Sequence, residues 1–563
     1  MYDNVYTTAL KEHQAGNLEA AKTLYFTSLK ANPNNADVLH LLGMLFAQQQ
    51  DFSKAQHYLD QALQFNSQSP TFLNSMGNVL KYLQRYEDAM QHYQKALLLQ
   101  PNNPPLHNNI GNIFSLLGRL ASAKEHYSKA IHLNPQYADA HYNLSLLLTK
   151  QNQQAKAKKH AEITIQLQPD HERAHAHLAH LLQLEGKLAS AISHYRLALK
   201  INPRNISANH NLGVILTEQG NYATAITHFK TVLALQPEHT ESLYNLGIIF
   251  LRQKNPRSAL PYFLQLTKQK QDYSVYYNIG VIYMDLRQPT EAIFYFNSVL
   301  KTKPDDFATH VNLGSIYLHQ QNYSAAEKHY NHSQLLQPNN QEIAYILAAL
   351  QQKNYPSQAP AEYIEHLFDN YAPYFETHLQ LLDYQVPQLL FTVVSNIIQT
   401  KKLGNSLRVL DLGCGTGMSG IKFKSLAQEL IGIDLAKNML QEANKKNIYT
   451  ELRHVSIEQA ITEYSAIDII IAAESLVYFG DLTNIFTQCY LALKHQGIFA
   501  YTLEHTKKYP YTLQRSARFA HAKKYVIATA QTCHFTVLHD SKIILRKHHD
   551  NVVYGHIFVL QKT

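Results

Sequence analysis

The residues best suited to chemistry lie in one short run, Val409-Leu-Asp-Leu-Gly-Cys-Gly-Thr-Gly417, where a strand is predicted to end and a helix to begin. Glycines at such a turn let the backbone approach a ligand closely. A carboxylate, Asp434, closes the next predicted strand 21 residues beyond Gly413. Because an acid so placed can accept both ribose hydroxyls of a nucleoside, the spacing predicts a nucleoside-containing cofactor at this edge of a sheet.

Two classes of cofactor fit this spacing. Gly415, Gly417 and Gly420 also match the dinucleotide-binding pattern of glycines, but Asp411 would repel a pyrophosphate. The run Asp-Leu-Gly-Cys-Gly-Thr-Gly resembles the first motif of class I S-adenosylmethionine-dependent methyltransferases. That resemblance implies S-adenosyl-L-methionine as the cofactor, with Asp411 and the glycine loop around its cationic methionine part. A nicotinamide enzyme and a scaffold without cofactor remain the alternatives.

The resemblance extends over residues 361–563. Segments 368–379, 472–482, 518–521 and 553–555 look like those of bacterial predicted methyltransferases that carry tetratricopeptide repeats. The resemblance implies a Rossmann-like α/β domain with a mostly parallel, seven-stranded sheet, and one departure is Ser456, near the place where that group usually has an acid. The residues that it assigns to the cofactor are Asp411, Gly413, Gly415, Gly417, Asp434, Leu435, Met439, Ser456, Ile457, Glu474 and Tyr371.

Three further side chains are candidates for catalysis. Methyl transfer from a sulfonium is an in-line displacement, so positioning can supply most of the rate and a base is needed only for a protonated acceptor. Glu474 follows the fourth predicted strand and Tyr478 lies one helical turn later. His521, after the fifth strand, is a second candidate base, and Arg518 beside it suits an anionic substrate or a solvated helix face. Glu474 is equally suited to bond the cofactor or to cap a helix.

A repeat of 34 residues fills the chain before this domain. Small residues recur at Gly43, Gly77 and Gly111 and keep this phase to Ala348, with one 33-residue step. An alanine follows each by 12 residues, and a proline often ends the unit. This pattern resembles the tetratricopeptide repeat, which implies an α-solenoid of about ten repeats over residues 1–353, capped by a last helix. Residues 354–360, with two prolines, are predicted to be a linker.

Six asparagines share one register in these repeats. In tetratricopeptide superhelices the first helix of each hairpin lines the concave face, and this ladder looks like that of the O-linked N-acetylglucosamine transferase superhelix. An amide both donates and accepts hydrogen bonds, so it can hold a peptide backbone regardless of side chain. The alternatives are a solvated polar face or bonds between neighbouring hairpins. The six are Asn109, Asn143, Asn211, Asn245, Asn278 and Asn312.

The composition of the chain indicates which partners and which cellular location to expect. In 563 residues, Lys plus Arg exceed Asp plus Glu by 50 to 42, which is no clear nucleic-acid signal. The three cysteines have neither zinc nor disulfide spacing, so we expect no metal site and a cytoplasmic location. No apolar run of 18 residues and no signal-peptide pattern occurs, so we expect no membrane partner. Nothing in the sequence sets an oligomeric state.

Together these features predict an S-adenosylmethionine-dependent methyltransferase whose repeats recruit a protein or peptide, with methyl transfer to nitrogen or oxygen. The first alternative is a small-molecule methyltransferase whose repeats bind a partner. The second is an interaction scaffold with a catalytically weak cofactor domain.

Overall fold

A computed structural model describes residues 2–269, 272–401, 404, 406–548 and 551–563. The chain divides into two compact units, residues 1–271 and 272–563. Each unit is described below by itself. Within the described residues no helix is both long and apolar enough to cross a lipid bilayer.

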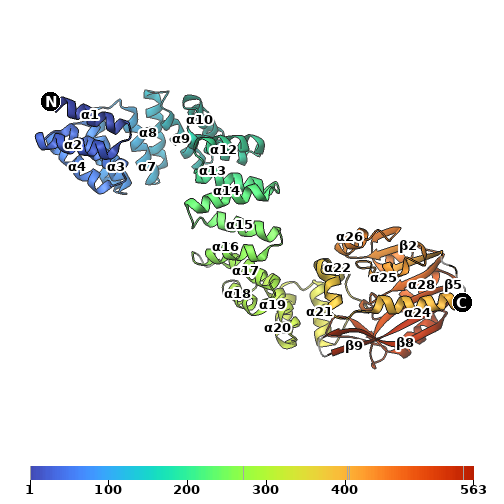
Figure 1. The fold of residues 1–563 in the computed structure, drawn as a ribbon. Coiled ribbons are helices and arrows are strands. Elements are labelled where there is room, and N and C mark those ends of the chain that lie inside the picture. Colours follow the sequence, from blue (N-terminus) through green and yellow to red (C-terminus); the bar gives the residue numbers. More distant parts are fainter. Residues whose placement is uncertain (1, 270–271, 402–403, 405, 549–550) are drawn as a thin grey trace. The chain divides into compact units, whose positions relative to one another are not determined.

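The first unit consists of eight helical hairpins (Figure 1). Each pairs a helix of 13 residues with one of 12 or 14, confirming the predicted repeat. The helices are α1 (Tyr2–Gln14), α2 (Leu18–Ala31), α3 (Ala36–Gln48), α4 (Phe52–Phe65), α5 (Pro70–Tyr82), α6 (Tyr86–Leu99), α7 (Pro104–Leu116), α8 (Leu120–Leu133), α9 (Ala138–Lys150), α10 (Gln154–Leu167), α11 (Glu172–Leu184), α12 (Leu188–Ile201), α13 (Ile206–Glu218), α14 (Tyr222–Leu235), α15 (Thr240–Arg252) and α16 (Pro256–Thr267).

Five of these eight hairpins are held together where a glycine of the first helix meets a large side chain of the second, and the other three have Ala9, Ser145 or Ala179 at that position. A Cβ added at Gly111 would lie 2.6 Å from the Tyr127 ring, and one at Gly77 would lie 2.5 Å from the Tyr93 ring. Both rings are almost completely buried. The two helices therefore approach closely only because the first one has no side chain there.

Histidine pairs link the two helices of several hairpins. Nδ1 atoms of the two rings lie 3.2 Å apart in His107–His126 and 2.9 Å apart in His141–His160. Nε2 of His107 also lies 3.1 Å from the carbonyl oxygen of Pro101. Since a carbonyl only accepts hydrogen bonds, Nε2 of His107 carries the proton, and His126 donates from its Nδ1. The same arrangement occurs in His175–His194 and His310–His329.

The second unit begins with two further hairpins and a final helix, and these are followed by the α/β part. The helices are α17 (Tyr273–Asp285), α18 (Pro289–Thr302), α19 (Phe307–His319), α20 (Tyr323–Leu336) and α21 (Gln341–Gln351). Together with the first unit this gives ten hairpins in the described residues, as predicted. Tyr345 and Ala349 of α21 lie in the same hydrophobic core as strands of the α/β part. The last helix is therefore more than a solvated cap.

A sheet of nine strands, counted over the described residues, forms the centre of the α/β part. Its strands are β1 (Leu407–Leu412), β2 (Ala427–Asp434), β3 (Glu451–His454), β4 (Ile467–Ala472), β5 (Leu493–His505), β6 (Tyr511–Leu513), β7 (Phe519–His521), β8 (Phe535–His548) and β9 (Asn551–Lys562). Strands β3, β2, β1, β4 and β5 are neighbours in that order and run parallel. Strand β9 pairs antiparallel with β5 and β8.

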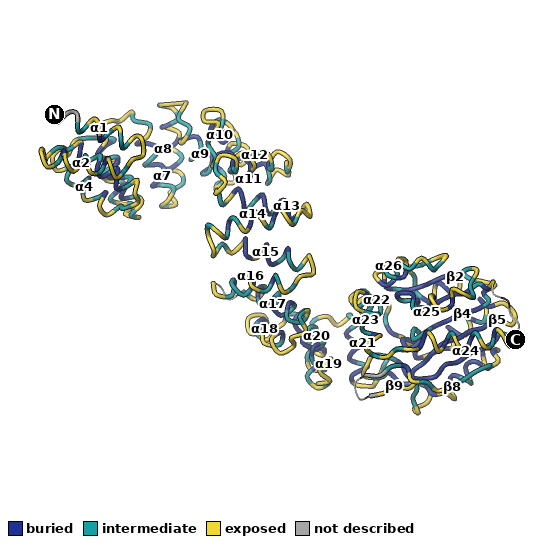
Figure 2. The backbone as a smooth tube through the Cα atoms, viewed as in Figure 1, coloured by how far each residue is buried: buried dark blue, intermediate teal, exposed yellow. Residues whose placement is uncertain are grey.

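The mostly parallel sheet is confirmed, and the strand count exceeds the predicted seven. The extra pair is the short antiparallel β6 and β7, of which β7 continues the sheet beside the end of β5. Its strands have only three residues each, too few to show a periodic pattern in the sequence. The central strands are buried along most of their length (Figure 2).

Four helical segments come before the first strand in the sequence, and the others lie between strands. They are α22 (Ala361–Tyr371), η1 (Ala372–Tyr374), α23 (Phe375–Leu381), α24 (Val386–Lys401), α25 (Met418–Phe423), α26 (Lys437–Lys445), α27 (Ile457–Ile461), η2 (Leu476–Tyr478), α28 (Thr483–Ala492) and α29 (Lys523–Thr532). In the predicted linker, Ala359 donates a backbone hydrogen bond to Tyr478. The segment is therefore bonded to the α/β part.

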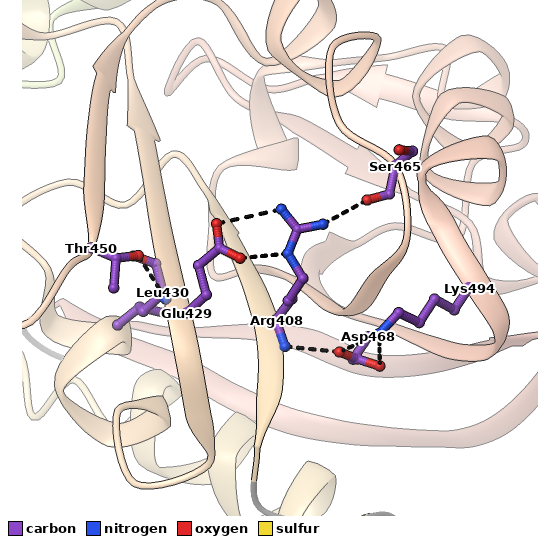
Figure 3. Close-up of polar contacts among 7 residues, drawn as sticks. All are labelled: Arg408, Glu429, Leu430, Thr450, Ser465, Asp468 and Lys494. Atoms are coloured by element: carbon purple, nitrogen blue, oxygen red, sulfur yellow. Dashed lines mark hydrogen bonds and ion pairs between the residues drawn. The ribbon is translucent and has the colours of Figure 1, made fainter.

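Polar contacts join the strands near the start of β1 (Figure 3). The guanidinium of Arg408 donates to Glu429 of β2 at 2.5 Å. The backbone N–H of Arg408 donates to Asp468 of β4 at 2.8 Å. Lys494 of β5 lies 3.0 Å from the same Asp468. These contacts favour one register across four parallel strands, which brings their carboxyl ends to a common edge.

Candidate functional site

A cavity of about 680 Å³ opens at the carboxyl ends of β1, β2 and β4, a size typical of sites for small ligands. Its walls come from the loop after β1, the end of β2, the start of α27 and the loop after β4. Helices α22 and α23 and the end of α19 complete it. Nine of the eleven predicted cofactor residues and His319 of the last hairpin thus line one cavity within the second unit.

The glycine loop lines one end of this cavity at Gly413 and Gly415. Both have positive φ, at 69° and 55°, which favours glycine. A Cβ at Gly413 would lie 2.5 Å from Cβ of Ser475, whereas one at Gly415 would meet only the Phe375 ring at 3.9 Å. The backbone is thus exposed to a ligand at Gly415. Gly417 lies outside the lining, beside the Tyr449 ring.

Asp434 lines the cavity next to this loop. Its Oδ2 accepts the backbone N–H of Gly415 at 2.8 Å, and its Oδ1 accepts that of Ala436 at 2.8 Å. Burial raises the pKa of Asp434, while the hydrogen bonds from Ala436 and Gly415 act to lower it. Each carboxylate oxygen keeps a second lone pair, so both can still accept a ligand hydroxyl.

Asp411 lies behind the loop and outside the cavity lining. It is 1% exposed, and its Oδ2 accepts the hydroxyl of Tyr449 at 2.7 Å. Burial raises its pKa to about 7, against the effect of that hydrogen bond. The implied direct contact of Asp411 with a cationic amino group therefore does not appear in this geometry, and the residue supports the loop from behind.

Apolar and aromatic side chains make up much of the same end. Leu435, Met439 and Ile457 line it, and Met439 is fully buried. Tyr371 and Phe375 also line it, with ring centroids 5.3 Å apart at an interplanar angle of 86°. The Tyr371 hydroxyl bonds Nδ1 of His378. The two aromatic side chains thus form a wall of the cavity beside the glycine loop.

Ser456 lines the cavity, but its hydroxyl already has a local partner. Its oxygen accepts the backbone N–H of Gln459 at 3.2 Å and so caps α27. Glu458 lines the cavity two residues later, with Oε1 bonded by Gln358 at 3.0 Å. A carboxylate therefore lines the cavity two positions after Ser456.

The other end of the cavity has a cluster of charges. Oε1 of Glu474 contacts both Arg546 and, at 3.4 Å, Arg518. Glu504 of β5 pairs with the same two arginines, at 2.5 Å to Arg546 and 3.7 Å to Arg518. Glu474 is only 11% exposed, and the hydroxyl of Tyr384 bonds it too. Because Oε1 is shared by two guanidinium groups, Glu474 is poorly placed to act as the base that we expected.

Tyr478 lines the cavity beside this cluster. The residue is 4% exposed, and its hydroxyl has no hydrogen-bond partner of good geometry in the described residues. The Arg518 guanidinium lies 6.0 Å from its ring centroid. Burial raises the pKa of this phenol, and Arg518 acts to lower it.

His521 is placed differently from the expectation. It is 2% exposed, its Nε2 lies 3.0 Å from the carbonyl of Gly480, and it is not among the residues that line the cavity. Burial lowers its pKa to about 4. The pairing of β7 with the end of β5 buries this side chain, so the structure does not bring it together with the other candidates.

The predicted asparagines are all half-buried, and they differ in their partners. Asn109 donates to Asn74 at 2.9 Å, and Asn143 donates to Asn108 at 2.9 Å. Asn312 reaches the hydroxyl of Tyr277 at 3.3 Å. These bonds join neighbouring hairpins, which was one of the alternatives. In the described residues Asn211, Asn245 and Asn278 make no such bond to the first helix of a neighbouring hairpin, although Asn211 bonds the hydroxyl of Tyr195 in α12.

Several site residues had no signal in the sequence. Arg546 comes from the long strand β8, and Tyr384 from the loop before α24. His319 reaches the cavity from α19, in the last repeat. None belongs to a motif or a fixed spacing, because tertiary packing alone brings them to the cavity. Among the described residues, no group of three His, Cys, Asp or Glu side chains is arranged to hold a metal ion.

Models of known protein families match both the repeats and the α/β part of the chain. A family model for a methyltransferase domain matches residues 409–497. Models for the tetratricopeptide repeat match residues 12–77, 77–118, 111–152, 172–205, 204–272 and 283–350.

Similar proteins match parts of the chain. A provisionally assigned methyltransferase of Geobacillus sp. (strain WCH70) is 32% identical over 117 residues, covering 19% of this chain and 46% of that protein. A provisionally assigned S-adenosylmethionine-dependent methyltransferase of Saccharomyces cerevisiae is 26% identical over 122 residues, covering 20% and 41%. The chain thus spans less than half of these relatives' length. The solved structure of pilF from Pseudomonas aeruginosa is 23% identical and covers 37% of this chain and 94% of its own, with a TM-score of 0.33.

Proposed function

We propose that this tetratricopeptide-repeat protein, which carries a methyltransferase domain, transfers a methyl group from S-adenosyl-L-methionine to a nitrogen or oxygen of a protein or peptide that its repeats recruit. One observation carries the proposal: the glycine loop and Asp434 share a cavity with Glu474 and Tyr478. The cavity thus offers a cofactor end and an acceptor end. The alternatives remain a small-molecule acceptor and a scaffold role.

The residues of the cofactor end fit the expected ligand. Asp434 would accept the ribose hydroxyls, since each of its oxygens has a free lone pair beside the backbone bonds. The apolar side chains of Met439 and Ile457 would pack against the adenine, and Tyr371 and Phe375 would exclude water. When bound, S-adenosylmethionine supplies a methyl group on a cationic sulfur. The chain's own contribution is to orient the two reactants in line.

Recruitment by the repeats rests on the asparagines that, in the described residues, do not bond the first helix of a neighbouring hairpin. Asn211, Asn245 and Asn278 share the predicted register. Replacing these three together by Ala should weaken capture of a protein partner without changing helicity. Unaltered capture in a pull-down would contradict the peptide-binding role.

The direct test of the activity is a labelled-methyl experiment. The full chain is incubated with methyl-labelled S-adenosylmethionine and an extract of proteins and metabolites. Label on a protein band that Asp434→Ala fails to produce supports the proposal. Label on small molecules alone favours the small-molecule alternative, and no label with a bound cofactor favours the scaffold.

A further inference from the structure

We infer that the acceptor is a carboxylate, so that the product is a methyl ester. The inference rests on the activity proposed above and names the class of acceptor for the same cavity. It comes from three features of the acceptor end in the described residues: a pair of arginines, a buried tyrosine hydroxyl beside them, and neighbouring carboxylates that the arginines already bind.

The arginine pair consists of Arg518 and Arg546, and both line the cavity. Burial acts to lower the pKa of Arg518, but Tyr478, Glu474 and Glu504 together hold it above its ordinary value, so the group stays cationic. Contacts with the glutamates use only Nη1 of Arg518 and the two Nη atoms of Arg546. Because a guanidinium has five N–H donors, each arginine keeps donors for a further anion.

Tyr478 supplies a third donor at this end. Tyr478 lines the cavity, and its buried hydroxyl lies beside the Arg518 guanidinium without a hydrogen bond of good geometry in the described residues. A buried polar group left in this state costs about 1–3 kcal/mol. A ligand oxygen held by Arg518 would satisfy it. Glu474 and Glu504 balance the charge of the two arginines, but the guanidinium N–H donors that these pairs leave unused, together with the phenol, suit the two oxygens of a carboxylate, because the arginine fork can pair with that group at two points.

Proton transfer gives the second argument. A hydroxyl or ammonium acceptor must lose a proton, but Oε1 of Glu474 is bonded to both arginines and His521 lies outside the cavity lining. Of the two histidines in the lining, His378 bonds Tyr371, whereas His319 is exposed on α19 and donates its Nδ1–H to the Ser315 carbonyl, which leaves its Nε2 able to accept a proton. A carboxylate, with a pKa of about 4 in solution, is ionised at neutral pH and needs no base.

The reaction balances without a proton acceptor. One carboxylate oxygen forms the new bond to the methyl carbon while the methyl–sulfur bond breaks. The electron pair of that bond stays on sulfur, which changes from a cation to a neutral thioether. The acceptor changes from an anion to a neutral ester, and the arginines then hold the product less tightly.

Two sources can supply such a carboxylate: an acidic residue of a peptide or a small organic acid. The experiment separates them by using peptides from a protease-digested extract in one arm and a mixture of small dicarboxylic acids in the other. Both arms contain the full chain and methyl-labelled S-adenosylmethionine. The labelled product is then treated with alkali, which hydrolyses a methyl ester to volatile methanol but leaves N-methyl groups and methyl ethers intact.

We expect the label to become volatile, and the arm in which it appears identifies the source. Arg518→Gln should lower the rate by about tenfold or more, since charge-assisted hydrogen bonds are each worth roughly 1.5–3 kcal/mol. The rate of Arg518→Lys should lie between those of the parent and of Arg518→Gln, because lysine keeps the positive charge but not the forked guanidinium. The matched control Lys524→Gln removes a positive charge from an exposed site on α29 and should not change the rate.

The outcomes separate this inference from the function on which it rests. Label that resists alkali would overturn the carboxylate and leave methyl transfer standing. Bound cofactor without labelled product in either arm would overturn the acceptor class for both sources. Failure of the chain to bind S-adenosylmethionine would contradict the proposed function itself. Cofactor affinity also checks that the arginine variants are folded, because the proposed cofactor contacts come from Asp434 and the glycine loop and not from the arginines.

Discussion

At the scale of single residues, the sequence predicted that the glycine loop and Asp434 lie together, but it did not predict that Arg518 and Arg546 do. The glycine loop and Asp434 form a short motif whose function depends on backbone geometry, so their spacing alone identifies them. Arg546 has no such signal, because its position depends on how β8 packs beside β5. The base expected at His521 failed for the same reason, since the short strand β7 buries it.

Asp434 allows a prediction of cofactor affinity. Asp434→Ala removes the acceptor for both ribose hydroxyls, and we expect a loss of about 100-fold or more, since bonds to a charged group contribute roughly 1.5–3 kcal/mol each. Asp434→Asn keeps one carbonyl oxygen and should lose less. Calorimetric titration measures both, with thermal unfolding as the control for folding. Unchanged affinity in the alanine variant would refute the ribose contact.

At the scale of elements, the hairpins were predictable because the same packing of two helices recurs in every repeat. Small residues 34 apart meet large ones 16 positions later, as in Gly111 with Tyr127. The histidine pairs were not predicted, although their spacing of 19 residues recurs in the sequence. Asn209 and His228 show what that spacing requires: the amide donates to the Pro203 carbonyl at 2.9 Å and accepts from His228 at 2.8 Å.

The close contact between paired helices predicts the effect of one methyl group. Gly111→Ala places Cβ 2.6 Å from the Tyr127 ring, and overpacking of this kind costs about 1–3 kcal/mol. We expect a lower urea midpoint for unfolding. Gly111→Ala combined with Tyr127→Leu should recover part of the loss, because the smaller side chain leaves room. If Gly111→Ala alone were as stable as the parent, the two helices of the hairpin could move apart at no cost in free energy.

Because of the histidine pairs, we expect the free energy of unfolding of the repeats to fall in acid. Burial lowers the pKa of His160 to about 4 and also lowers that of His141, whereas an unfolded histidine titrates near about 6.5. Their stabilising contribution is therefore complete above about 6.5 and is lost progressively as pH falls toward about 4. After solvent screening we expect a loss of about 1 kcal/mol per pair near pH 5.

Urea unfolding at neutral pH and near pH 5 measures this effect. The matched variant is His107→Asn with His141→Asn and His175→Asn, because Asn209 shows that an amide fits the same place without titrating. This variant should lose less stability in acid than the parent. Equal losses would mean that other groups control the acid sensitivity.

At the scale of the whole molecule, the sequence predicted two architectures but not how the chain divides into compact units. The change of pattern at residues 354–360 marks where repeats end, and the predicted domain boundary rests on it. The second compact unit, however, begins at residue 272 and includes two hairpins. Tyr345 explains this, because it is 1% exposed in the core of the α/β part and its hydroxyl bonds Ala517 at 2.9 Å. A tertiary contact of this kind leaves no local pattern.

This division predicts how truncated chains behave. A chain of residues 272–563 should unfold cooperatively, whereas one of residues 361–563 loses Tyr345 and the rest of α21 from its core. Loss of a large buried aromatic side chain costs about 3–5 kcal/mol, so the shorter chain should unfold at a clearly lower temperature. Differential scanning calorimetry compares the two. Equal unfolding temperatures would place the functional boundary at the predicted linker.

The central claim is that the cavity binds S-adenosylmethionine, and calorimetric titration of the purified full chain tests it most directly. The titrants are S-adenosylmethionine, S-adenosylhomocysteine and, as the control, NADH. We predict micromolar binding of the first two and none of NADH, because the cavity offers Asp434 and apolar walls to a nucleoside while the buried Asp411 behind the loop disfavours a pyrophosphate. Binding of NADH alone, or of none of the three, would contradict the account.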